Sequence, residues 1–459
     1  MRYAIIGAGL AGLTAAHEIS TLDPAATIDV FEAGERIGGK LFTVPFDSGP
    51  VDLGAEAFLA RRADAVEFFR GLGLGEAIVH PSGLSSTVYS GGRLNALPKG
   101  GVMGIPASSA PVRELVSADT AARIDAEGEA PGIDWSVGDD TNVGALVRRR
   151  YGDEVVDRVV SALLGGVYSC TADDLGVRAT IPKLAEAFDE LAAAGEKVTL
   201  SAAVSRVQAG AVKQDGPVFG AFRGGYAELY ETLAEKSGAA IYLDAFISGA
   251  THDKQGKFVL KGGGDGAYDR LLLATPAPTT AVLLKQLAPA AAQELKRIKL
   301  ASSVVVGMKF DSATGLPDNS GVLVAADEPG MHAKAFTFSS KKWPHLAERG
   351  GALVRASFGR FGDETLVRAD EDDLVDHALD DLAAATGFDG RAAGLSEIYT
   401  QRWFGGLPRY DETHLATVAE VREALADAPA VEATGAWAGG VGVPAVVADA
   451  RAAAARLVG

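Results

Sequence analysis

The sequence predicts an α/β protein that opens with a dinucleotide-binding βαβ unit and continues with interleaved mixed segments. Three observations support this fold class. The first 32 residues read as strand, glycine turn, helix and strand, and strand-like and helix-like stretches alternate through the remainder of the 459 residues. We find no internal repeat and no Pro-rich or Gly/Ser-rich tether between modules. The length alone corresponds to roughly two or three domains at about 150 residues each.

The opening unit has the spacing of a dinucleotide site. Residues 3–6 are suited to a buried parallel strand, residues 13–22 to a helix, and residues 27–32 to a second strand. The turn has the pattern G-x-G-x-x-G, in which the first glycine allows a tight turn, the second lets the backbone approach a pyrophosphate, and the third lets helix and strand pack closely. The helix N-terminus favours phosphate, and the acidic residue 20 positions after the last glycine suits ribose hydroxyls. These residues are Gly7, Ala8, Gly9, Leu10, Ala11, Gly12 and Glu32.

The remaining elements follow from periodicity. Helices are predicted at 64–75, 142–164, 278–297, 371–386 and 443–457. Strands are predicted at 198–207, 240–247, 257–261, 270–274, 302–310, 321–325, 333–339, 352–358 and 395–403. Residues 107–140 are polar and acidic, which favours a loop or a mobile insertion.

Composition excludes several classes of protein. Lys and Arg number 43 and Asp and Glu number 60, so the net charge is −17, which argues against a nucleic-acid partner. The single cysteine, Cys170, rules out an intrachain disulfide and a cysteine-ligated zinc cluster. No pair of histidines has ligand spacing, so we expect no metal. No apolar run of membrane-spanning length is present, and we expect a reduced, cytoplasmic protein without a transmembrane segment.

The residues after Glu32 indicate the cofactor. Ala33 to Lys40 extend the fingerprint to E-A-x-x-R-x-G-G-K. This resembles the monoamine-oxidase and protoporphyrinogen-oxidase superfamily of flavoproteins, in which Arg36, Gly38 and Gly39 would lie along the FAD pyrophosphate. The resemblance therefore implies FAD as the resident cofactor.

Later segments, in order along nearly the whole chain, narrow the resemblance to the porphyrinogen oxidases. Residues 52–59 (DLGAEAFL) look like that family's second flavin-contact loop, and residues 98–106 are similar to its P-x-G-x-x-x-G-I-P turn. Residues 151–182 follow its helical core, and residues 222–229 match its GG-x-x-x-L helix start. Residues 402–414 resemble R-W-x-x-x-x-P-x-Y-x-x-x-H, and residues 439–444 look like the G-V-G-I-P turn before the last helix.

The resemblance implies a Rossmann-like FAD-binding domain interleaved with an α+β substrate-binding domain and a helical domain. FAD-binding parts are expected at 1–85, 198–277 and 426–459, a helical substrate-side domain at 86–197, and a mixed substrate-binding sheet at 278–425. Val204 would contact the adenine from a strand, Trp403 would lie beside the flavin, and the last helix would stabilise negative charge on the reduced flavin. Beyond the glycine turn and Glu32, the implied cofactor residues are Ala33, Arg36, Gly39, Lys40, Gly54, Ala55, Glu56, Ala57, Val204, Trp403, Val441, Gly442 and Val443.

The implied activity is oxygen-dependent, six-electron oxidation of a porphyrinogen in heme biosynthesis, with hydrogen peroxide as by-product. The flavin carries the difficult step, and no general base can be assigned from the sequence. The chain looks most like the soluble bacterial branch, which implies coproporphyrinogen III with its four carboxylates. Glu56 stands where eukaryotic-type enzymes often carry a substrate-binding arginine, so other groups must bind the carboxylates. Candidates for substrate contact, from position alone, are Arg61, Arg62, Lys99, Tyr168, Arg178 and Arg402.

Alternative functions remain open at this stage. Protoporphyrinogen IX oxidase is the nearest alternative. A flavin amine oxidase or carotenoid desaturase would share the scaffold, as would a non-catalytic binding protein of the Rab-escort type. The expected partners are a porphyrinogen, molecular oxygen and, transiently, the next enzyme of the heme pathway.

Overall fold

The computed structural model describes residues 1–211, 216–263 and 266–459 of the chain. They form two compact units, each assembled from segments that are distant in sequence. Unit 1 consists of Met1–Pro81, Gly216–Lys299 and Ala416–Gly459, and unit 2 consists of Ser82–Asp215 and Leu300–Leu415. The predicted α/β class and its interleaving are confirmed. The five-part division into cofactor and substrate segments concerns binding, and it stays a prediction.

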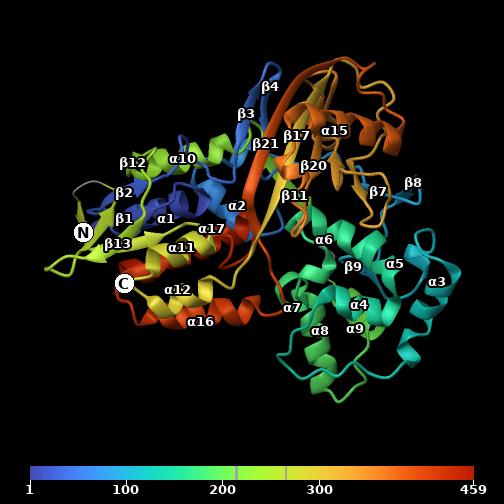
Figure 1. The fold of residues 1–459 in the computed structure, drawn as a ribbon, viewed down its shortest axis with the longest axis horizontal. Coiled ribbons are helices and arrows are strands. Elements are labelled where there is room, and N and C mark those ends of the chain that lie inside the picture. Colours follow the sequence, from blue (N-terminus) through green and yellow to red (C-terminus); the bar gives the residue numbers. More distant parts are fainter. Residues whose placement is uncertain (212–215, 264–265) are drawn as a thin grey trace. The chain divides into compact units, whose positions relative to one another are not determined.

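Unit 1 is built on a five-stranded parallel sheet with the order β12-β2-β1-β16-β22 (Figure 1). The strands alternate apolar side chains between two cores, because successive residues of a strand face opposite sides. Tyr3 and Ile5 point into one core, and Ala4 and Ile6 into the other. The strands are β1 (Arg2–Ile6), β2 (Thr27–Phe31), β12 (Ala240–Tyr242), β16 (Arg270–Leu273) and β22 (Val431–Ala433).

Helices cover both faces of this sheet. The first core packs against α1 (Leu10–Leu22), α10 (Ala227–Ser237), α17 (Val443–Val458) and α2 (Ala63–Gly71). The second core packs against α11 (Ala277–Leu284), α12 (Pro289–Leu295), α16 (His414–Ala426) and the small sheet β13 (Gly249–His252), β14 (Phe258–Lys261) and β15 (Ala267–Tyr268). The βαβ unit that the glycine pattern predicts is confirmed, since β1, α1 and β2 follow in order and the two strands pair in parallel.

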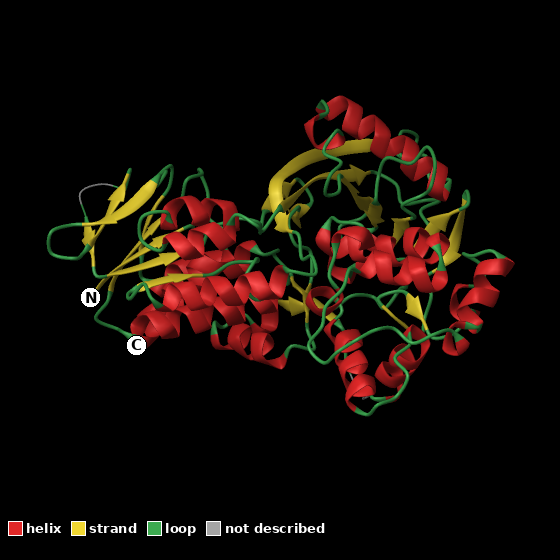
Figure 2. Ribbon diagram, turned by 60° about the horizontal axis from the view of Figure 1, so that its bottom comes forward, coloured by secondary structure: helices red, strands yellow, loops and turns green. Residues whose placement is uncertain are grey.

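Unit 2 contains a seven-stranded, mostly antiparallel sheet with the order β21-β17-β20-β19-β18-β7-β8. Helix α15 (Glu371–Thr386) covers one face, and Figure 2 shows it lying across the long strands. Residues such as Val306, Val354 and Phe336 fill the core beneath it. The strands are β7 (Thr87–Ser90), β8 (Arg93–Ala96), β17 (Leu300–Phe310), β18 (Gly321–Val324), β19 (Ala335–Thr337), β20 (Ala352–Phe358) and β21 (Leu395–Pro408).

Most of the rest of unit 2 is helical apart from the short hairpin of β9 (Gly101–Val102) and β10 (Ile105–Pro106), and here two sequence expectations are wrong. Residues 118–125 form helix α3 within the segment expected to be a loop, because the Ser117 side chain accepts from the Thr120 N–H and caps it. Residues 200–209 form helix α9 where a strand was expected. The other described α-helices of unit 2 are α4 (Val143–Tyr151), α5 (Asp153–Val155), α6 (Ser161–Tyr168), α7 (Val177–Thr180), α8 (Pro182–Ala193), α9 (Leu200–Ala209), α13 (Ser339–Lys342) and α14 (Pro344–Ala347), with a π-helical stretch at Val156–Val160.

The physical reason for α9 is a buried carboxylate at its start. Glu127 is 2% exposed and accepts hydrogen bonds from the N–H groups of Leu200 and Ser201 and from Arg150. Thr199 also caps the helix through its hydroxyl. A negative charge and two acceptors at a helix N-terminus favour the helix over a strand. The alternating apolar pattern around Val204 is too short to distinguish the two.

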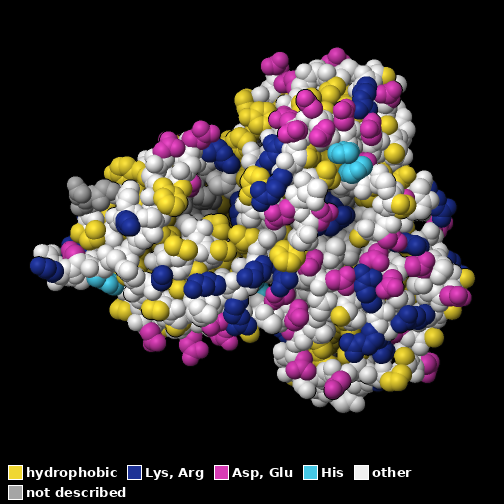
Figure 3. All heavy atoms as spheres, viewed as in Figure 1, with side chains coloured by type: hydrophobic (Ala, Val, Ile, Leu, Met, Phe, Trp, Pro, Cys, Tyr) yellow, Lys and Arg dark blue, Asp and Glu magenta, His cyan; other side chains and the backbone are white. Residues whose placement is uncertain are grey.

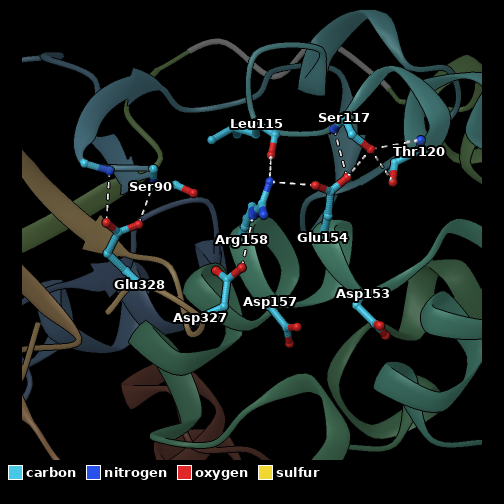
Figure 4. Close-up of polar contacts among 12 residues, drawn as sticks. Ser90, Leu115, Ser117, Thr120, Asp153, Glu154, Asp157, Arg158, Asp327 and Glu328 are labelled. Carbon is cyan, nitrogen blue, oxygen red and sulfur yellow. Dashed lines mark hydrogen bonds and ion pairs between the residues drawn. The ribbon is translucent and has the colours of Figure 1, made fainter. Parts of the chain in front are cut away.

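A network centred on Arg158 fastens the helical part to the sheet within unit 2 (Figure 4). Arg158 pairs with Glu154 at 2.9 Å and Asp327 at 3.1 Å, and it donates to the Leu115 carbonyl. Glu328, the neighbour of Asp327, accepts from the N–H groups of the β7–β8 turn. The N–H of Ala326 donates to the Asp157 carbonyl. The π-helical stretch, and with it the start of α6, is therefore held to the loop after β18.

On the face drawn in Figure 3, acidic and basic side chains are interspersed and form no extended basic patch. Across the described ranges, every helix is too short or too polar to span a lipid bilayer.

Replacing Arg158 should loosen this network measurably. We expect Arg158→Met to lower the free energy of unfolding by about 1–2 kcal/mol, because three hydrogen bonds to partly buried groups are lost. Arg206→Met is the matched control, since the ion-pair partners of Arg206 among the described residues, Glu190 and Glu196, are exposed. Surface pairs contribute under about 1 kcal/mol. Urea unfolding followed by circular dichroism measures both. Equal effects of the two substitutions would contradict the role of Arg158.

Candidate functional site

The candidate site lies at the carboxyl edge of the five-stranded sheet of unit 1. All five strands are parallel, so the segments that follow them meet at one edge. The glycine turn follows β1, Glu32 follows β2, and residues 243–247 follow β12. Helices α1 and α17 follow β1 and β22, so both begin at this edge. The fold therefore gathers two helix N-termini and an acidic side chain in one place.

The glycine turn explains why this edge can receive a ligand. Gly7 has φ +105°, which favours glycine, and a Cβ on Gly12 would lie 1.9 Å from the Gly7 carbonyl oxygen. Gly9 differs, because a Cβ there would make only an ordinary 3.5 Å contact with Gly39. Gly7 and Gly12 are thus needed for the fold, whereas the missing side chain of Gly9 leaves space at the start of α1.

The N-termini of α1 and α17 offer uncapped backbone donors. Gly9 is the N-cap of α1 and Gly442 the N-cap of α17; both are extended, and neither has a side-chain cap. The first turns of both helices contain no acidic side chain. Unsatisfied N–H groups together with the positive end of the helix dipole attract anions. This edge is suited to phosphate or to another delocalised negative charge.

Glu32 is fixed where the sequence predicts it. Its carboxylate accepts from the Ala8 N–H at 2.8 Å and from the Gly34 N–H at 2.9 Å. Each carboxylate oxygen can accept more than one hydrogen bond, so Glu32 can still receive a ribose hydroxyl. The adjacent residue Ala33 is exposed at the same turn.

Arg36 orders the turn that packs on the glycines. It donates to the carbonyls of Ile37, Gly39 and Leu41, and its guanidinium lies 4.0 Å from the ring centroid of Phe42. A Cβ on Gly39 would lie 2.8 Å from the Gly9 Cα. The turn from Arg36 to Leu41 therefore abuts the glycine turn directly, and Arg36 shapes it through backbone carbonyls.

Lys40 and the loop after β4 (Gly49–Asp52) continue this packing. Burial lowers the pKa of Lys40 to about 8. A Cβ on Gly54 would lie 2.1 Å from the Lys40 carbonyl oxygen, so only glycine fits there. Asp52 accepts from the Thr43 hydroxyl and from the Tyr226 N–H at the start of α10. Residues 53–57, which include Ala55, Glu56 and Ala57, are thereby held between α10 and the turn from Arg36 to Leu41.

The sequence reasoning missed one segment of this edge. The carbonyl of Tyr242 accepts from the Glu32 N–H, and the Ala245 N–H donates to the Glu32 carbonyl. Phe246, just beyond, is 66% exposed. Residues 243–247 thus line the edge beside Glu32, where the adenine contact was expected from Val204. The predicted strand at 240–247 was the available signal, because in a parallel sheet the strand next to β2 must end beside Glu32.

Two predicted cofactor residues do not lie in unit 1. Val204 is buried in α9 of unit 2, with its backbone in the helix. The strand expected around Val204 is therefore wrong, whereas its contact with the adenine stays a prediction. Trp403 lies on β21 of unit 2, opposite Ser303 of β17. The structure therefore groups the other predicted cofactor residues without Val204 and Trp403.

The predicted substrate residues have varied surroundings. Arg178 pairs with Asp189 at 2.9 Å and donates to the Asp139 carbonyl, so its charge is already compensated. Arg402 donates to the carbonyls of Val367 and Ala369. Tyr168 is 9% exposed, and burial raises its pKa to about 12. Arg61 and Lys99 are exposed, and the exposed Arg62 pairs with Asp64.

Comparisons with known proteins find similarity along nearly the whole chain. The family model described as flavin containing amine oxidoreductase matches residues 10–458. A protein of Mycobacterium tuberculosis named coproporphyrinogen III oxidase is 38% identical over 449 residues, which cover 97% of this chain and 94% of that protein. Proteins of the same name from Mycobacterium leprae and Bacillus subtilis are 39% and 30% identical, covering 97% and 96% of this chain and 95% and 94% of their own lengths.

Solved structures show the same fold. An Exiguobacterium structure, provisionally assigned as a protoporphyrinogen oxidase, superposes with a TM-score of 0.87 at 27% identity, covering 100% of this chain and 99% of that one. Cyclohexylamine oxidase from Brevibacterium oxydans has a TM-score of 0.69 at 17% identity, covering 99% and 98%. The second likeness concerns the fold alone.

The two glycines should respond differently to the same substitution. We expect Gly12→Ala to destabilise the nucleotide-free protein by more than about 3 kcal/mol, because its Cβ would overlap a backbone oxygen. Gly9→Ala should change stability by less than about 1 kcal/mol, because its conformation is extended and the space is open. Urea unfolding of the nucleotide-free variants measures the difference. A loss in Gly9→Ala as large as that in Gly12→Ala would show that the space at Gly9 is needed for folding.

Proposed function

The chain belongs to the flavin containing amine oxidoreductase family, and we propose that it is an FAD-dependent oxidase of coproporphyrinogen III. The supporting observation is similarity without interruption: relatives of that name match 97% of this chain at up to 39% identity. The carboxyl edge of the sheet in unit 1 supplies a matching dinucleotide site. Both the cofactor and the substrate class follow from one continuous resemblance.

The residues at the sheet edge fit FAD. The space left by Gly9 and the N–H groups at the start of α1 would receive the pyrophosphate, and Glu32 would accept from the ribose hydroxyls. Residues 243–247 would flank the adenine. Lys40 and the loop 53–57 would lie along the remainder of the cofactor, with Arg36 holding their turn in shape.

The N-terminus of α17 would favour the reduced cofactor. When bound, the flavin supplies hydride acceptance, and reduction adds negative charge to its pyrimidine side. The N–H groups at Val441, Gly442 and Val443 present the positive end of a 16-residue helix to such a charge. The chain's own contribution is orientation and electrostatic stabilisation, and no side chain is assigned as a general base.

The full reaction removes six electrons from the macrocycle, so the cofactor must be reoxidised three times. We propose molecular oxygen as the acceptor, which gives hydrogen peroxide. We further propose that the enzyme acts in the cytoplasm and passes its porphyrin to the next enzyme of the heme pathway. Trp403, on strand β21 of unit 2, remains our candidate for contact with the flavin.

Protoporphyrinogen IX is the second candidate substrate. The favouring observation is the likeness to the Exiguobacterium structure over the whole chain. The two substrates differ in their number of carboxylates, four against two, so the enzyme must distinguish them by charge recognition.

Steady-state kinetics test the proposal. Purified holoenzyme is assayed with coproporphyrinogen III, protoporphyrinogen IX and cyclohexylamine, following porphyrin fluorescence and peroxide. We expect kcat/KM to be at least about tenfold higher for coproporphyrinogen III, which corresponds to about 1.4 kcal/mol of transition-state binding. A preference for protoporphyrinogen IX, or turnover of the amine alone, would refute the substrate assignment. Absence of peroxide during turnover would refute oxygen as acceptor.

Cofactor affinity should depend on pH through Lys40. The pKa of Lys40 is about 8 in the free protein because of burial, and an adjacent phosphate would raise it. Above pH 8 the free protein loses this charge while the complex keeps it, so FAD affinity should fall by up to about tenfold per pH unit. Below pH 8 both states are charged, and affinity should be level.

Titration of the nucleotide-free protein with FAD between pH 7 and 9.5, followed by flavin fluorescence, measures this dependence. Lys40→Met should abolish the slope. Lys236→Met is the control, since Lys236 is exposed on α10 of the same unit, and it should keep the slope. The same dependence of FAD affinity on pH in the wild type, Lys40→Met and Lys236→Met would show that Lys40 does not interact with the cofactor.

A further inference from the structure

Arg360, just after β20 in unit 2, is a half-buried arginine that forms no ion pair within the described part of the chain. Its Nε atom is buried and has no acceptor among the described residues. Burial lowers the pKa of Arg360, and only Asp363 opposes this shift. A buried guanidinium that lacks an acceptor carries an uncompensated desolvation cost. An anion from outside the chain would offset this cost.

Helix α6 makes room for this arginine. A Cβ built on Gly165 would lie 3.9 Å from the Nε of Arg360 and 3.3 Å from the Cys170 carbonyl oxygen. The guanidinium therefore lies along the last turn of α6. The helix ends at Ser169, which has φ +51°, and the Ser169 carbonyl accepts from the Phe361 N–H at 2.8 Å.

A second cation is buried at the same helix end. Lys334 is 5% exposed, and its Nζ donates to the Ser169 hydroxyl at 2.8 Å and to the Gly359 carbonyl at 2.6 Å. Burial, followed by repulsion from Arg360, lowers the pKa of Lys334 to about 7. No carboxylate pairs with Lys334 among the described residues, since both of its acceptors are neutral.

A third cation adjoins the first two through Phe361. The guanidinium of Arg409 lies 4.7 Å from the Phe361 ring centroid and pairs with Asp411 at 2.6 Å. The Nε of Arg409 is also buried without an acceptor in the described ranges. We call Lys334, Arg360 and Arg409 the cation cluster. Its one ion-paired carboxylate is that of Asp411.

Aromatic rings flank the cation cluster. Tyr168, the last residue of α6, contacts Tyr410 with ring centroids 5.9 Å apart, and Tyr410 stacks on His414 at 3.7 Å. Tyr410 directly follows Arg409 in the chain. All three rings are buried, so the cation cluster stands against aromatic packing. Aromatic packing beside basic groups is compatible with a flat ligand that carries acidic substituents.

We propose that the cation cluster binds a carboxylate of the porphyrinogen substrate, with Arg360 as the principal donor. The inference rests on the proposed function and names the recognition group within it. The planar guanidinium fork matches a carboxylate, and the missing acceptor would be supplied by the ligand. In a chain of net charge −17, recognition of a tetracarboxylate requires such a local excess of positive charge.

The test compares binding of two probes to purified holoenzyme. Coproporphyrin III carries the four carboxylates, and its tetramethyl ester carries none. We expect Arg360→Met to raise the Kd for coproporphyrin III by at least about tenfold, because a charge-assisted contact is lost. The Kd for the ester should be the same in both proteins. Quenching of porphyrin fluorescence measures all four values.

Two further variants sharpen the result. Arg360→Lys keeps the positive charge but loses the planar guanidinium. Its Kd for coproporphyrin III should therefore lie between those of the wild type and Arg360→Met. Arg391→Met is the control, because Arg391 is exposed and pairs with Asp376 and Asp380; it should bind like the wild type. An Arg360→Met protein with unchanged Kd for coproporphyrin III would overturn the proposal, as would an equal loss for the ester.

Stability distinguishes recognition from a structural role. Removing an unpaired buried charge should leave Tm unchanged or raise it. A lowered Tm with unchanged Kd would assign Arg360 to folding and overturn the proposal. If sodium acetate alone raises the Tm of the wild type and coproporphyrin III binds both proteins equally, the cluster holds a free carboxylate instead. A wild type that neither binds coproporphyrin III nor oxidises coproporphyrinogen III refutes the proposed function together with this inference.

Discussion

The contact between Gly12 and the Gly7 carbonyl is the constraint on which the cofactor edge depends. It sets the distance between α1 and β1, and that distance leaves the start of α1 open at Gly9. The turn from Arg36 to Leu41 then packs on Gly9, the loop carrying Gly54 packs on Lys40, and Asp52 ties this loop to α10. At Gly12, Gly39 and Gly54 backbone lies directly against backbone, so a methyl group added at any of these three would displace the neighbouring segment.

The sequence predicted this edge well because the residues that form it lie close together in the chain. Gly7, Gly9, Gly12 and Glu32 act through spacing within one βαβ unit, and the structure places them as the spacing requires. The substrate side could not be predicted in the same way. Lys334, Arg360 and Ser169 are distant in sequence and meet only when β19, β20 and α6 have packed, so nothing in the pattern around each residue marks it.

The strand wrongly expected at 198–207 has a physical cause that can be located. Val204 lies in a short stretch compatible with either strand or helix, and the decision comes from Glu127, more than 70 positions earlier, whose carboxylate stabilises the start of α9. Arg178 matched a family pattern, yet its charge is used by Asp189. A motif identifies a position, but only the partners of a side chain show whether its charge is available to a ligand.

The interleaving of the two units has a consequence for synthesis on the ribosome. Every segment of unit 2 has been made once Leu415 is added, whereas the sheet of unit 1 lacks its edge strand β22 and its covering helix α17 until the last residues emerge. The helix α17 packs directly on α1, which was made first. Domains fold as units during translation. Unit 2 can therefore fold before unit 1, although unit 1 contains the first segment of the chain. The part of α1 that α17 covers therefore stays without this partner until α17 has been synthesised.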